Sequence, residues 1–540
     1  MKRVTAWVAT AVAVAMVTVA CSSGGGGGGS AGSTSAPPGA QGGTYSFANG
    51  EPTSLIPQNN YEAYGSQVFE AIFTRLMTYD FKTGAPVPAQ AESVTPSSDG
   101  LTYTIKIKDG WTFHNGEPVT AQSYVDAWNF AAYGPNGYIL NFFFDKVVGY
   151  DALNPSKGKP STKELSGLKV VDPTTFTVTL TAPFSQFPAQ LGFDAFDPLP
   201  KAFFDNPDAF NEKPIGDGPY MMDGAWKHDE TINLTRYPDY AGTPGFADNI
   251  KLPMYTGDSY WADFQAGNVD ITTVGSSNLA EARTNYADSL NEQPSSSFFF
   301  LGIPTYDPRF QNKELRQALS MAIDRQAIMT AILINEDPAD DAISPVIQGY
   351  RAGACQYCTL DAAGAKQKLA DAGGWTGTLT LNYIADDPVL EQAMEAVANQ
   401  WKANLGIDVK LNPIGANQYY GFSLGHKMTG PWWDGWVMDY PSIQDYLTPL
   451  YGKNGGYNVS GYDNPAFDDL MTQGDAAATM DASIPTYQQG DDMILEDMPV
   501  IPWGFGGFNS VNQPTVTNVL KDGPLDQLAL ELVQVVQPSS

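Results

Sequence analysis

A helix followed directly by a strand is the pattern in this sequence that most constrains its fold. Asp387-Pro388 fits a helix N-cap followed by proline in the first turn, and Gly406 fits the residue that ends a helix. Between them lies one apolar face, made of Leu390, Ala393, Met394, Val397 and Trp401. Residues 407–411 then alternate apolar and polar side chains, as a half-buried strand does. A helix joined to a strand by so short a turn predicts a mixed α/β protein.

Strand patterns dominate the earlier part of the chain. Residues 101–108 alternate apolar side chains with Thr and Lys, and residues 176–180 alternate in the same way. Residues 315–323 instead carry an apolar stripe at helical spacing. The chain has 540 residues, whereas a single hydrophobic core stops growing at roughly 250–300 residues. We therefore expect at least two lobes, with strands concentrated in the first part.

The N-terminus has the layout of a secretory signal peptide. Lys2 and Arg3 precede an apolar run, residues 4–20, that carries no charge. This run of 17 residues is slightly short for a spanning helix, which needs roughly 20 residues. An uncleaved membrane anchor is the alternative. Residues 22–43 follow as a Gly/Ser/Pro-rich tether, and a flexible chain of that length reaches roughly 25–30 Å.

Thr18-Val19-Ala20-Cys21 resembles the lipobox of bacterial lipoproteins, in which the Cys becomes the new N-terminus and carries lipid. The resemblance implies that residues 1–20 are removed and that Cys21 is lipidated. Residues 21–43 would then tether the folded body. The expected location is outside the cytoplasm, with the lipid holding the protein to the outer face of the cytoplasmic membrane.

The charge balance argues against nucleic acid as a partner. The chain has 29 Lys and Arg against 59 Asp and Glu, a formal net charge of −30. Binding to phosphates needs clustered basic residues. Three His and three Cys are too few for a His-rich metal site or a disulfide-dense scaffold. We expect no metal and no cofactor.

Cys355 and Cys358 form a Cys-Gln-Tyr-Cys motif that has three interpretations. It fits a redox pair, half of a zinc site, or a small structural disulfide inside one loop. No second Cys pair and no nearby His completes a zinc site. Because thiols oxidise outside the cytoplasm, the structural disulfide is favoured.

The sequence contains no recognised catalytic motif. H-E-x-x-H, G-x-S-x-G and a glycine-rich phosphate loop between a strand and a helix are all missing. Residues 504–507 are Gly-rich but lack Lys, and we expect a hinge or turn there. A secreted hydrolase that uses a pair of carboxylates is a remote alternative. We expect a binding protein rather than an enzyme.

Aromatic residues make up 12% of the chain and concentrate in residues 430–441. The rings of this segment belong to Trp432, Trp433, Trp436 and Tyr440. They indicate either a buried cluster at a domain junction or the wall of a ligand cleft. In the second case Asp434 or Asp439 would orient the ligand. A buried carboxylate needs a cationic or hydrogen-bonding partner, and a ligand ammonium supplies one.

Short motifs in a fixed order along most of the chain resemble a known family. They lie at residues 52–57, 68–73, 77–80, 99–103, 113–121, 216–220, 267–270, 315–319, 322–325, 436–440, 462–463, 467–468 and 497–502. In this order they resemble the extracellular solute-binding proteins of family 5, the peptide- and nickel-type receptors of ABC importers. The resemblance runs from about residue 45 to about residue 503.

The resemblance implies an α/β, periplasmic-binding-protein-like fold of type II. Two lobes would be joined by a hinge, with the extra inserted subdomain of the large class. The first lobe would be discontinuous and comprise residues 44–66, 189–297 and 507–540. Residues 67–188 would form the inserted β-rich subdomain and residues 298–506 the second lobe. Residues 297–301 would be a strand beside the hinge.

The resemblance also implies ligand contacts. In the oligopeptide binders of the family, the Asp of a Trp-x-x-Asp-Tyr motif holds the α-ammonium of the peptide, and Asp439 occupies that position here. Gly435 and Val437 would pair with the extended peptide as an added strand. Trp436 and Tyr440 would line the first side-chain pocket.

The opposite wall of the cleft would include Tyr61 and Glu62, from the segment 60–62, and Tyr138. Trp433 stands where some peptide binders of the family place Arg. A cation for the peptide carboxylate is therefore not expected there, and the length of the ligand stays open.

These features predict a monomeric, membrane-tethered receptor. It would capture a short peptide or a related amine and deliver it to the permease subunits of an ABC importer. An oligosaccharide receptor of the same family is the alternative, because stacked Trp and Tyr rings suit sugars.

Overall fold

The computed structural model describes residues 41–80, 83–385 and 387–536. The expected signal peptide of residues 1–20, the expected lipidation site Cys21 and most of the expected tether lie outside these residues. In the part of the chain that is described, no helix is both long and apolar enough to cross a membrane.

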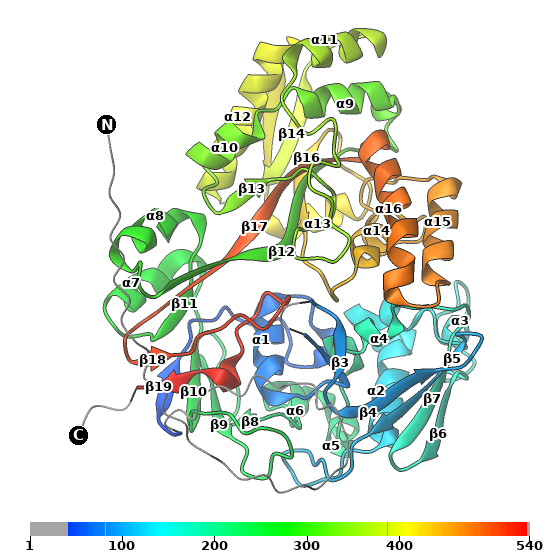
Figure 1. Ribbon diagram of the computed structural model, residues 1–540, viewed down its shortest axis with the longest axis vertical. Helices are drawn as coiled ribbons and strands as arrows, with labels where there is room; N and C mark the ends of the chain where they lie inside the picture. The colour runs from blue at the N-terminus through cyan, green and yellow to red at the C-terminus, as the bar shows by residue number, and fades with distance from the viewer. Residues whose placement is uncertain (1–40, 81–82, 386, 537–540) are drawn as a thin grey trace, which may run out of the picture. The chain divides into compact units, whose positions relative to one another are not determined.

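A seven-stranded mixed sheet contains the aromatic segment (Figure 1). Its strands follow the order β11, β17, β12, β16, β14, β15, and β13 pairs with β17. The strands are β11 (Ile271–Thr273), β12 (Leu290–Gly302), β13 (Glu336–Pro338), β14 (Leu379–Ile384), β15 (Val409–Ile414), β16 (Trp432–Trp436) and β17 (Val500–Asn512). The two longest strands, β12 and β17, lie side by side in antiparallel register. The strand expected at residues 297–301 is the second half of β12.

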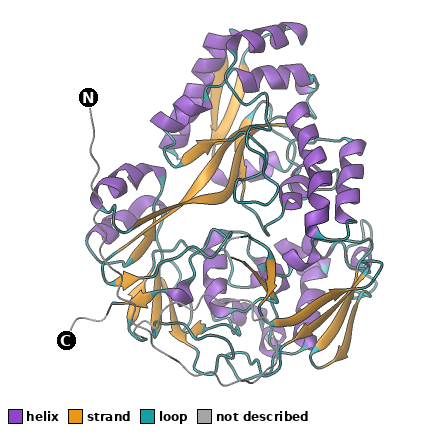
Figure 2. Cartoon of the chain, in the orientation of Figure 1, coloured by secondary structure: helices purple, strands orange, loops and turns teal. Residues whose placement is uncertain are grey.

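Two four-stranded sheets come from the earlier part of the chain, as expected (Figure 2). One contains β1 (Thr44–Ser46), β10 (Asn249–Pro253), β9 (Thr231–Arg236) and β8 (Tyr220–Met222) in that order. The other contains β4 (Ala91–Pro96), β5 (Thr102–Ile107), β7 (Thr175–Thr179) and β6 (Leu168–Asp172). Two-stranded sheets pair β2 (Met77–Tyr79) with β3 (Pro86–Pro88) and β18 (Val516–Thr517) with β19 (Gln534–Val535). β5 and β7 confirm the two strands predicted from alternation.

The helices are distributed along the whole described chain. The earlier ones are α1 (Ala63–Ile72), α2 (Ala121–Ala132), α3 (Tyr150–Leu153), α4 (Phe187–Gln190), α5 (Lys201–Asp205), α6 (Pro207–Glu212), α7 (Tyr260–Gln265) and α8 (Ser276–Asn285). The later ones are α9 (Lys313–Met321), α10 (Arg325–Ala331), α11 (Ala362–Asp371), α12 (Pro388–Leu405), α13 (Ala416–Ser423), α14 (Ile443–Tyr451), α15 (Pro465–Asp475) and α16 (Met480–Asp497).

Helix α12 confirms the helix predicted between Asp387 and Gly406. The Asp387 carboxylate accepts hydrogen bonds from the backbone N–H groups of Val389 (3.0 Å) and Leu390 (2.9 Å), as an N-cap does. Gly406 ends the helix with φ 73°. The predicted apolar face is buried against a core shared by α9, α11, α12 and β14. The following strand, β15, starts at Val409, two residues later than the alternation suggested.

The Gly-rich residues 504–507 lie inside strand β17, so the expected hinge or turn is wrong. Neighbouring chain segments approach these glycines closely, as is common for glycine inside a strand. A Cβ on Gly504 would lie 2.8 Å from the Glu336 Oε2, and one on Gly507 would lie 2.6 Å from the Asn335 Oδ1. Glu336 lies in β13 and Asn335 directly precedes it. Strand β13 pairs with this part of β17.

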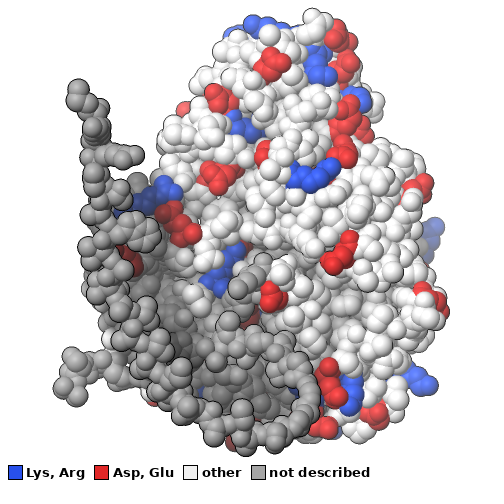
Figure 3. Space-filling view, viewed as in Figure 1, with Lys and Arg blue, Asp and Glu red and all other residues white. Residues whose placement is uncertain are grey.

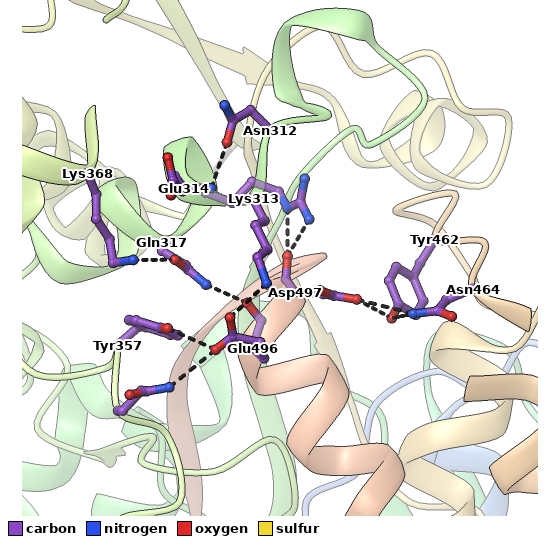
Figure 4. Close-up of polar contacts among 12 residues, drawn as sticks. Asn312, Lys313, Glu314, Gln317, Tyr357, Lys368, Tyr462, Asn464, Glu496 and Asp497 are labelled. Carbon is purple, nitrogen blue, oxygen red and sulfur yellow. Dashed lines mark hydrogen bonds and ion pairs between the residues drawn. The ribbon is translucent and has the colours of Figure 1, made fainter. Parts of the chain in front are cut away.

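Polar contacts join α9 to the C-terminal end of α16, directly before β17 (Figure 4). Lys313 Nζ lies 2.8 Å from Glu496 Oε1, and the Tyr357 hydroxyl donates to Glu496 Oε2 at 2.8 Å. The buried Arg316 donates to the carbonyls of Asp497 and Met498 at 2.8 and 3.0 Å. These bonds fix the start of β17, which pairs with β12 and so supports β16.

The loop before α11 is closed by a disulfide. Cys355 and Cys358 are bonded, with Cα atoms 5.4 Å apart. The buried Arg325 donates to the Cys358 carbonyl at 2.7 Å and to the Pro502 carbonyl at 2.7 Å. Both arginines of the 315–325 motifs are thus occupied by backbone carbonyls and serve packing.

Acidic and basic side chains are interspersed on the face seen in Figure 3, and basic residues do not gather into one patch there. Within the described residues, no group of three or more His, Cys, Asp or Glu side chains is placed to hold a metal ion.

Candidate functional site

Strand β16 has an edge without a neighbouring strand, directly at the aromatic segment. On one side it pairs with β12, where Trp436 lies opposite Phe298. On the other side β14 meets it at one position, where Asn382 lies opposite Trp432. Beyond that position, no strand of the described chain covers this side of β16. An uncovered edge can accept an extended peptide as an added strand.

The backbone of Gly435 points toward this edge. The Tyr419 hydroxyl, from α13, donates to the Trp433 carbonyl, so that carbonyl points away from β12. Backbone groups alternate in direction along a strand, and Gly435 therefore shares the direction of Trp433, while Val437 directly follows the end of β16. Val437 is 51% exposed. Pairing of a peptide with these residues stays a prediction.

Gly435 has no room for a side chain. An added Cβ would lie 2.7 Å from Cδ1 of Phe299. The Phe299 ring in turn stacks on Trp433, with ring centroids 5.3 Å apart and planes 25° apart. The Trp433 indole Nε1 is buried and has no hydrogen-bond partner in the described chain. Trp433 therefore belongs to the packing of β16 on β12.

Asp434 is committed to the local structure. Its oxygens accept hydrogen bonds from the Trp432 indole (3.0 Å), the Gly435 N–H (3.0 Å) and the Tyr457 hydroxyl (2.9 Å). Burial raises the pKa of Asp434 to about 6, although the three hydrogen bonds favour the ionised form and act to lower the pKa. Of the two carboxylates that the sequence left open, Asp434 has its partners within the protein.

Asp439 has none. Its side chain is partly buried, and none of the residues that the structure describes gives its carboxylate a hydrogen bond or an ion pair. Burial, followed by the charge of Asp194, raises its pKa to about 7. A cation beside this carboxylate would favour the ionised form and offset the cost of burial. These properties fit the predicted ammonium role of Asp439, which stays a prediction.

Asp445 lies beneath Asp439 at the start of α14 and is fully buried. Its Oδ2 accepts hydrogen bonds from the Asp439 N–H at 2.9 Å and the Trp436 indole at 3.2 Å. Burial and the charge of Asp439 raise its pKa well above the ordinary range. Asp445 thus holds two of the predicted ligand-binding residues in place.

Trp436 and Tyr440 differ in how far they are buried. Trp436 is partly exposed, and its ring lies 5.5 Å from that of Tyr457. Tyr440 is only 2% exposed, and its hydroxyl donates to Gln444 Oε1. Trp432 and Tyr440 are core residues, as the buried-cluster interpretation expects, while Trp436 and Val437 border the edge. A ligand cleft at this segment stays a prediction.

An ion pair from another part of the chain faces Asp439. Asp194, in the short helix η4 (Asp194–Phe196), binds Arg75 Nη2 at 2.6 Å and accepts from the Ser66 hydroxyl at 2.6 Å. Arg75 also binds Glu70 at 2.6 Å. The charge of this arginine is therefore already shared by two carboxylates, and the region around Asp439 stays acidic.

The three residues predicted for the opposite wall of the cleft differ in their exposure and in their contacts. Tyr61 is 65% exposed, and its hydroxyl acts electrostatically on Tyr420 of α13, so the structure brings it near the β16 side. Glu62 is the N-cap of α1, where its carboxylate accepts from Tyr64 N–H at 2.6 Å. Tyr138 packs edge-on against Phe130, with centroids 5.4 Å apart. Contact of Tyr61, Glu62 and Tyr138 with a ligand stays a prediction.

Sequence reasoning missed Asp445, Asp194 and Tyr419. Asp445 follows Asp439 by six residues, just beyond the aromatic segment of residues 430–441, and could have been considered. Asp194 and Tyr419 carry no motif, and only the folded chain brings them to the site.

Comparison with known proteins places this geometry in context. A family model described as "Bacterial extracellular solute-binding proteins, family 5 Middle" matches residues 85–458. The chain is 27% identical to the oligopeptide-binding protein OppA of Bacillus subtilis over 505 residues, which cover 88% of this chain and 89% of that protein. It is 26% identical to the dipeptide-binding protein DppE of the same organism, with 86% of each chain covered.

The fold is similar to solved structures over nearly the whole chain. The crystal structure of Haemophilus influenzae OppA in complex with RPPGFSPFR has a TM-score of 0.75 at 22% identity. The likeness covers 93% of this chain and all of the other. It confirms the predicted α/β fold of the periplasmic-binding-protein type, and the matching family agrees with the expectation of a binding protein rather than an enzyme.

Proposed function

Because the chain belongs to family 5 of the bacterial extracellular solute-binding proteins, we propose that it captures a short peptide by its free amino terminus and delivers it to an ABC importer. The peptide's ammonium would bind Asp439, and its extended backbone would pair along residues 435–437. The names of the similar proteins, which include an oligopeptide- and a dipeptide-binding protein, support this choice of ligand.

The single observation that carries the proposal is the state of the Asp439 carboxylate. It is partly buried, lies next to an uncovered strand edge and has no partner among the residues described. A buried carboxylate is costly unless a cation or donors compensate it. An extended peptide supplies the ammonium and the backbone hydrogen bonds from one end of one molecule.

Two measurements test the proposal. Mass spectrometry of the denatured eluate identifies what co-purifies with the protein. Titration calorimetry then compares peptides that have a free amino terminus with their N-acetylated forms. We expect the free forms to bind and the acetylated forms to bind far more weakly. Equal affinity for both forms would show that the ammonium is not recognised.

Replacement of the carboxylate gives a sharper test of the same contact. We expect Asp439→Asn to weaken peptide binding by at least about 2 kcal/mol, because it removes a charged partner from a partly buried contact. Asp408→Asn is the matched control, since Asp408 is 69% exposed and its one ion pair among the described residues is with Lys402. If both variants bind peptide like the parent protein, the ammonium role of Asp439 is wrong.

An oligosaccharide is the alternative ligand. The exposed rings of Tyr61 and Tyr420 favour it, because aromatic faces stack on sugars and the two residues interact electrostatically. A thermal-shift screen of sugars beside peptides separates the two ligands, since a ligand at 100 times its Kd stabilises the folded protein by about 2.7 kcal/mol.

We further propose that lipid on Cys21 holds the receptor at the membrane. The chain would be divided into two lobes and an inserted subdomain, with the boundaries that the resemblance implies. Cys21→Ser should release the protein from the membrane fraction while peptide binding stays unchanged. Retention in the membrane fraction would instead indicate an uncleaved anchor.

A further inference from the structure

Three carboxylates from separate segments surround the predicted ammonium site, and this inference rests on the proposed function. Asp439 follows β16, Asp445 belongs to α14, and Asp194 to η4. Asp194 and Asp445 face Asp439 electrostatically, and Tyr440 is the third titratable group that does so. Asp194 is itself paired with a cation, Arg75, which also binds Glu70.

The geometry of Asp445 indicates a neutral acid. Oδ2 accepts both hydrogen bonds, from the Asp439 N–H and the Trp436 indole. Oδ1 is buried and has no hydrogen-bond partner among the described residues. The other titratable groups that face Asp445 are Tyr79, Tyr440 and Tyr446, which are neutral hydroxyls. A proton on Oδ1 leaves both accepted bonds intact and removes an uncompensated buried charge.

Two neighbouring carboxylates, one partly and one fully buried, do not both ionise readily. The site therefore has room for one negative charge, and that charge is stabilised only when a cation is present. Burial and Asp194 raise the pKa of Asp439 to about 7, which puts its ionisation within the pH range that can be measured.

We propose that Asp439 exchanges a proton for the cationic amino terminus of the peptide, and that Asp445 is a positioning residue that stays protonated and holds the Asp439 backbone and the Trp436 ring. In the ligand-free protein at mildly acidic pH, Asp439 is a neutral carboxylic acid. When the ammonium binds, the O–H bond of Asp439 breaks and its proton leaves to solvent. The ammonium keeps all its protons, so one cation enters the site and one proton leaves it.

Titration calorimetry with trialanine tests the exchange. The titrations are run at several pH values from 5 to 7, where a peptide amino group with a pKa of about 7.7–8.0 stays protonated. Each is repeated in buffers that differ in ionisation enthalpy, and the difference gives the number of protons released. N-acetyl-trialanine serves as the ligand control, because it has no cation to exchange.

We expect close to one proton released per trialanine at pH 5.5, and about half a proton near pH 7, where Asp439 is half ionised. Below that pH the Kd should rise about tenfold for each pH unit. Trialanine binding without proton release across this range would overturn the exchange and leave the proposed function standing.

Two substitutions at Asp445 test its positioning role. Asp445→Asn keeps an oxygen acceptor and mimics the protonated acid, so trialanine affinity at pH 7 should stay within about threefold of the parent. Asp445→Leu removes the acceptor and should weaken binding at least about tenfold, the scale of a lost buried hydrogen bond. If Asn weakens binding as much as Leu does, Asp445 acts through its charge and the positioning role is wrong. The Asn variant tests the positioning role of Asp445 even if the Leu variant does not fold.

Asp217→Asn is the matched control for the pH dependence. Asp217 is another fully buried acid whose pKa burial raises to about 7, and its own partners are Thr74 and Gln90. The variant should release the same number of protons on binding trialanine as the parent. A loss of release in Asp217→Asn would show that the protons come from the protein at large, and would overturn the assignment to Asp439.

A ligand-free measurement separates this inference from the proposed function. If trialanine does not bind at any pH, the peptide function fails for this probe, and the melting temperature of the empty protein still reports the proton on Asp439. The parent should then lose more thermal stability than Asp439→Asn as the pH rises from 5 to 7. Parallel curves for the two proteins would overturn the proton exchange.

Discussion

The ring of Phe299 lies so close to Gly435 that it dictates the residue there. A Cβ at this position would lie 2.7 Å from Cδ1 and 3.1 Å from Cε1 of the ring. The ring cannot shift without disturbing its stacking on Trp433. The Cα of Gly435 is thus fixed against β12 by packing, and this defines the plane of the uncovered edge.

We predict that Gly435→Ala destabilises the protein by about 1–3 kcal/mol, the usual cost of overpacking a filled site. Peptide binding should weaken with it, because the edge of β16 moves. Chemical denaturation and calorimetry measure the two effects. Gly421→Ala is the control: a Cβ there meets no atom within 4 Å, and in helix α13 alanine should be neutral or mildly stabilising. Unchanged stability of Gly435→Ala would mean that the Phe299 ring moves freely.

Single residues of the site were predictable where a local motif marks them. Asp439 and its neighbours 435–437 lie within one short motif, so the sequence alone was enough to single them out. Asp194 lies in a distant segment without any motif, and its proximity depends on the folded chain. Glu62 was predicted for the ligand wall, yet its carboxylate caps α1, a role that its position before the helix could equally have indicated.

At the scale of elements, the end of α16 is held by a buried arginine. Arg316 donates to four carbonyls, those of Phe310, Gln311, Asp497 and Met498, at 2.8–3.0 Å. Met498, with φ 49°, ends the helix in a left-handed conformation. The arginine therefore supplies donors to a helix end whose last carbonyls have no partner within the helix.

We predict that Arg316→Leu costs about 3 kcal/mol or more, because several buried carbonyls lose their only charged donor, at about 1–3 kcal/mol for an unsatisfied group. Urea denaturation measures the loss. Arg309→Leu is the control, since Arg309 is half exposed, pairs with Asp307 in its own turn and donates to one carbonyl from a distant segment, that of Thr429, at 2.7 Å. A loss of less than about 1 kcal/mol in Arg316→Leu would contradict the capping role.

Elements were predictable where start, face and stop signals agree. For α12 the cap, the apolar face and the final glycine all agreed, and both ends were predicted to the residue. For β17 the glycines suggested a turn, because the sequence does not show that β13 approaches from a distant segment. The glycines of a strand and those of a turn look alike until the neighbour is known.

At the scale of the whole molecule, buried acids set the response to pH. Burial raises the pKa of Asp217 and Glu531 to about 7, of Glu336 to about 8 and of Asp341 to about 9. A carboxyl whose folded pKa is raised stabilises the folded state fully below its ordinary pKa near 4. That contribution is lost as the pH rises through the folded pKa.

We predict that the unfolding free energy of the ligand-free protein falls as the pH rises from 6.5 to 8.5, by about 1 kcal/mol or more per pH unit, since a single group contributes up to about 1.4 kcal/mol per unit. Urea titrations at several pH values measure it. The window avoids His114, whose pKa burial lowers to about 4 and which acts in the opposite direction below pH 6.5. A stability that rises across this window would show that these acids are ionised without cost.

The order of the strands along the chain has a consequence for biosynthesis. β17 pairs with β11, β12 and β13 and lies inside the seven-stranded sheet, yet it spans residues 500–512 of 540. The sheet cannot close until that segment has left the ribosome, whereas domains generally begin to fold from their N-terminal end during synthesis. The seven-stranded sheet is therefore completed by the strand that emerges after the six others, so the nascent chain stays without this sheet for most of its synthesis.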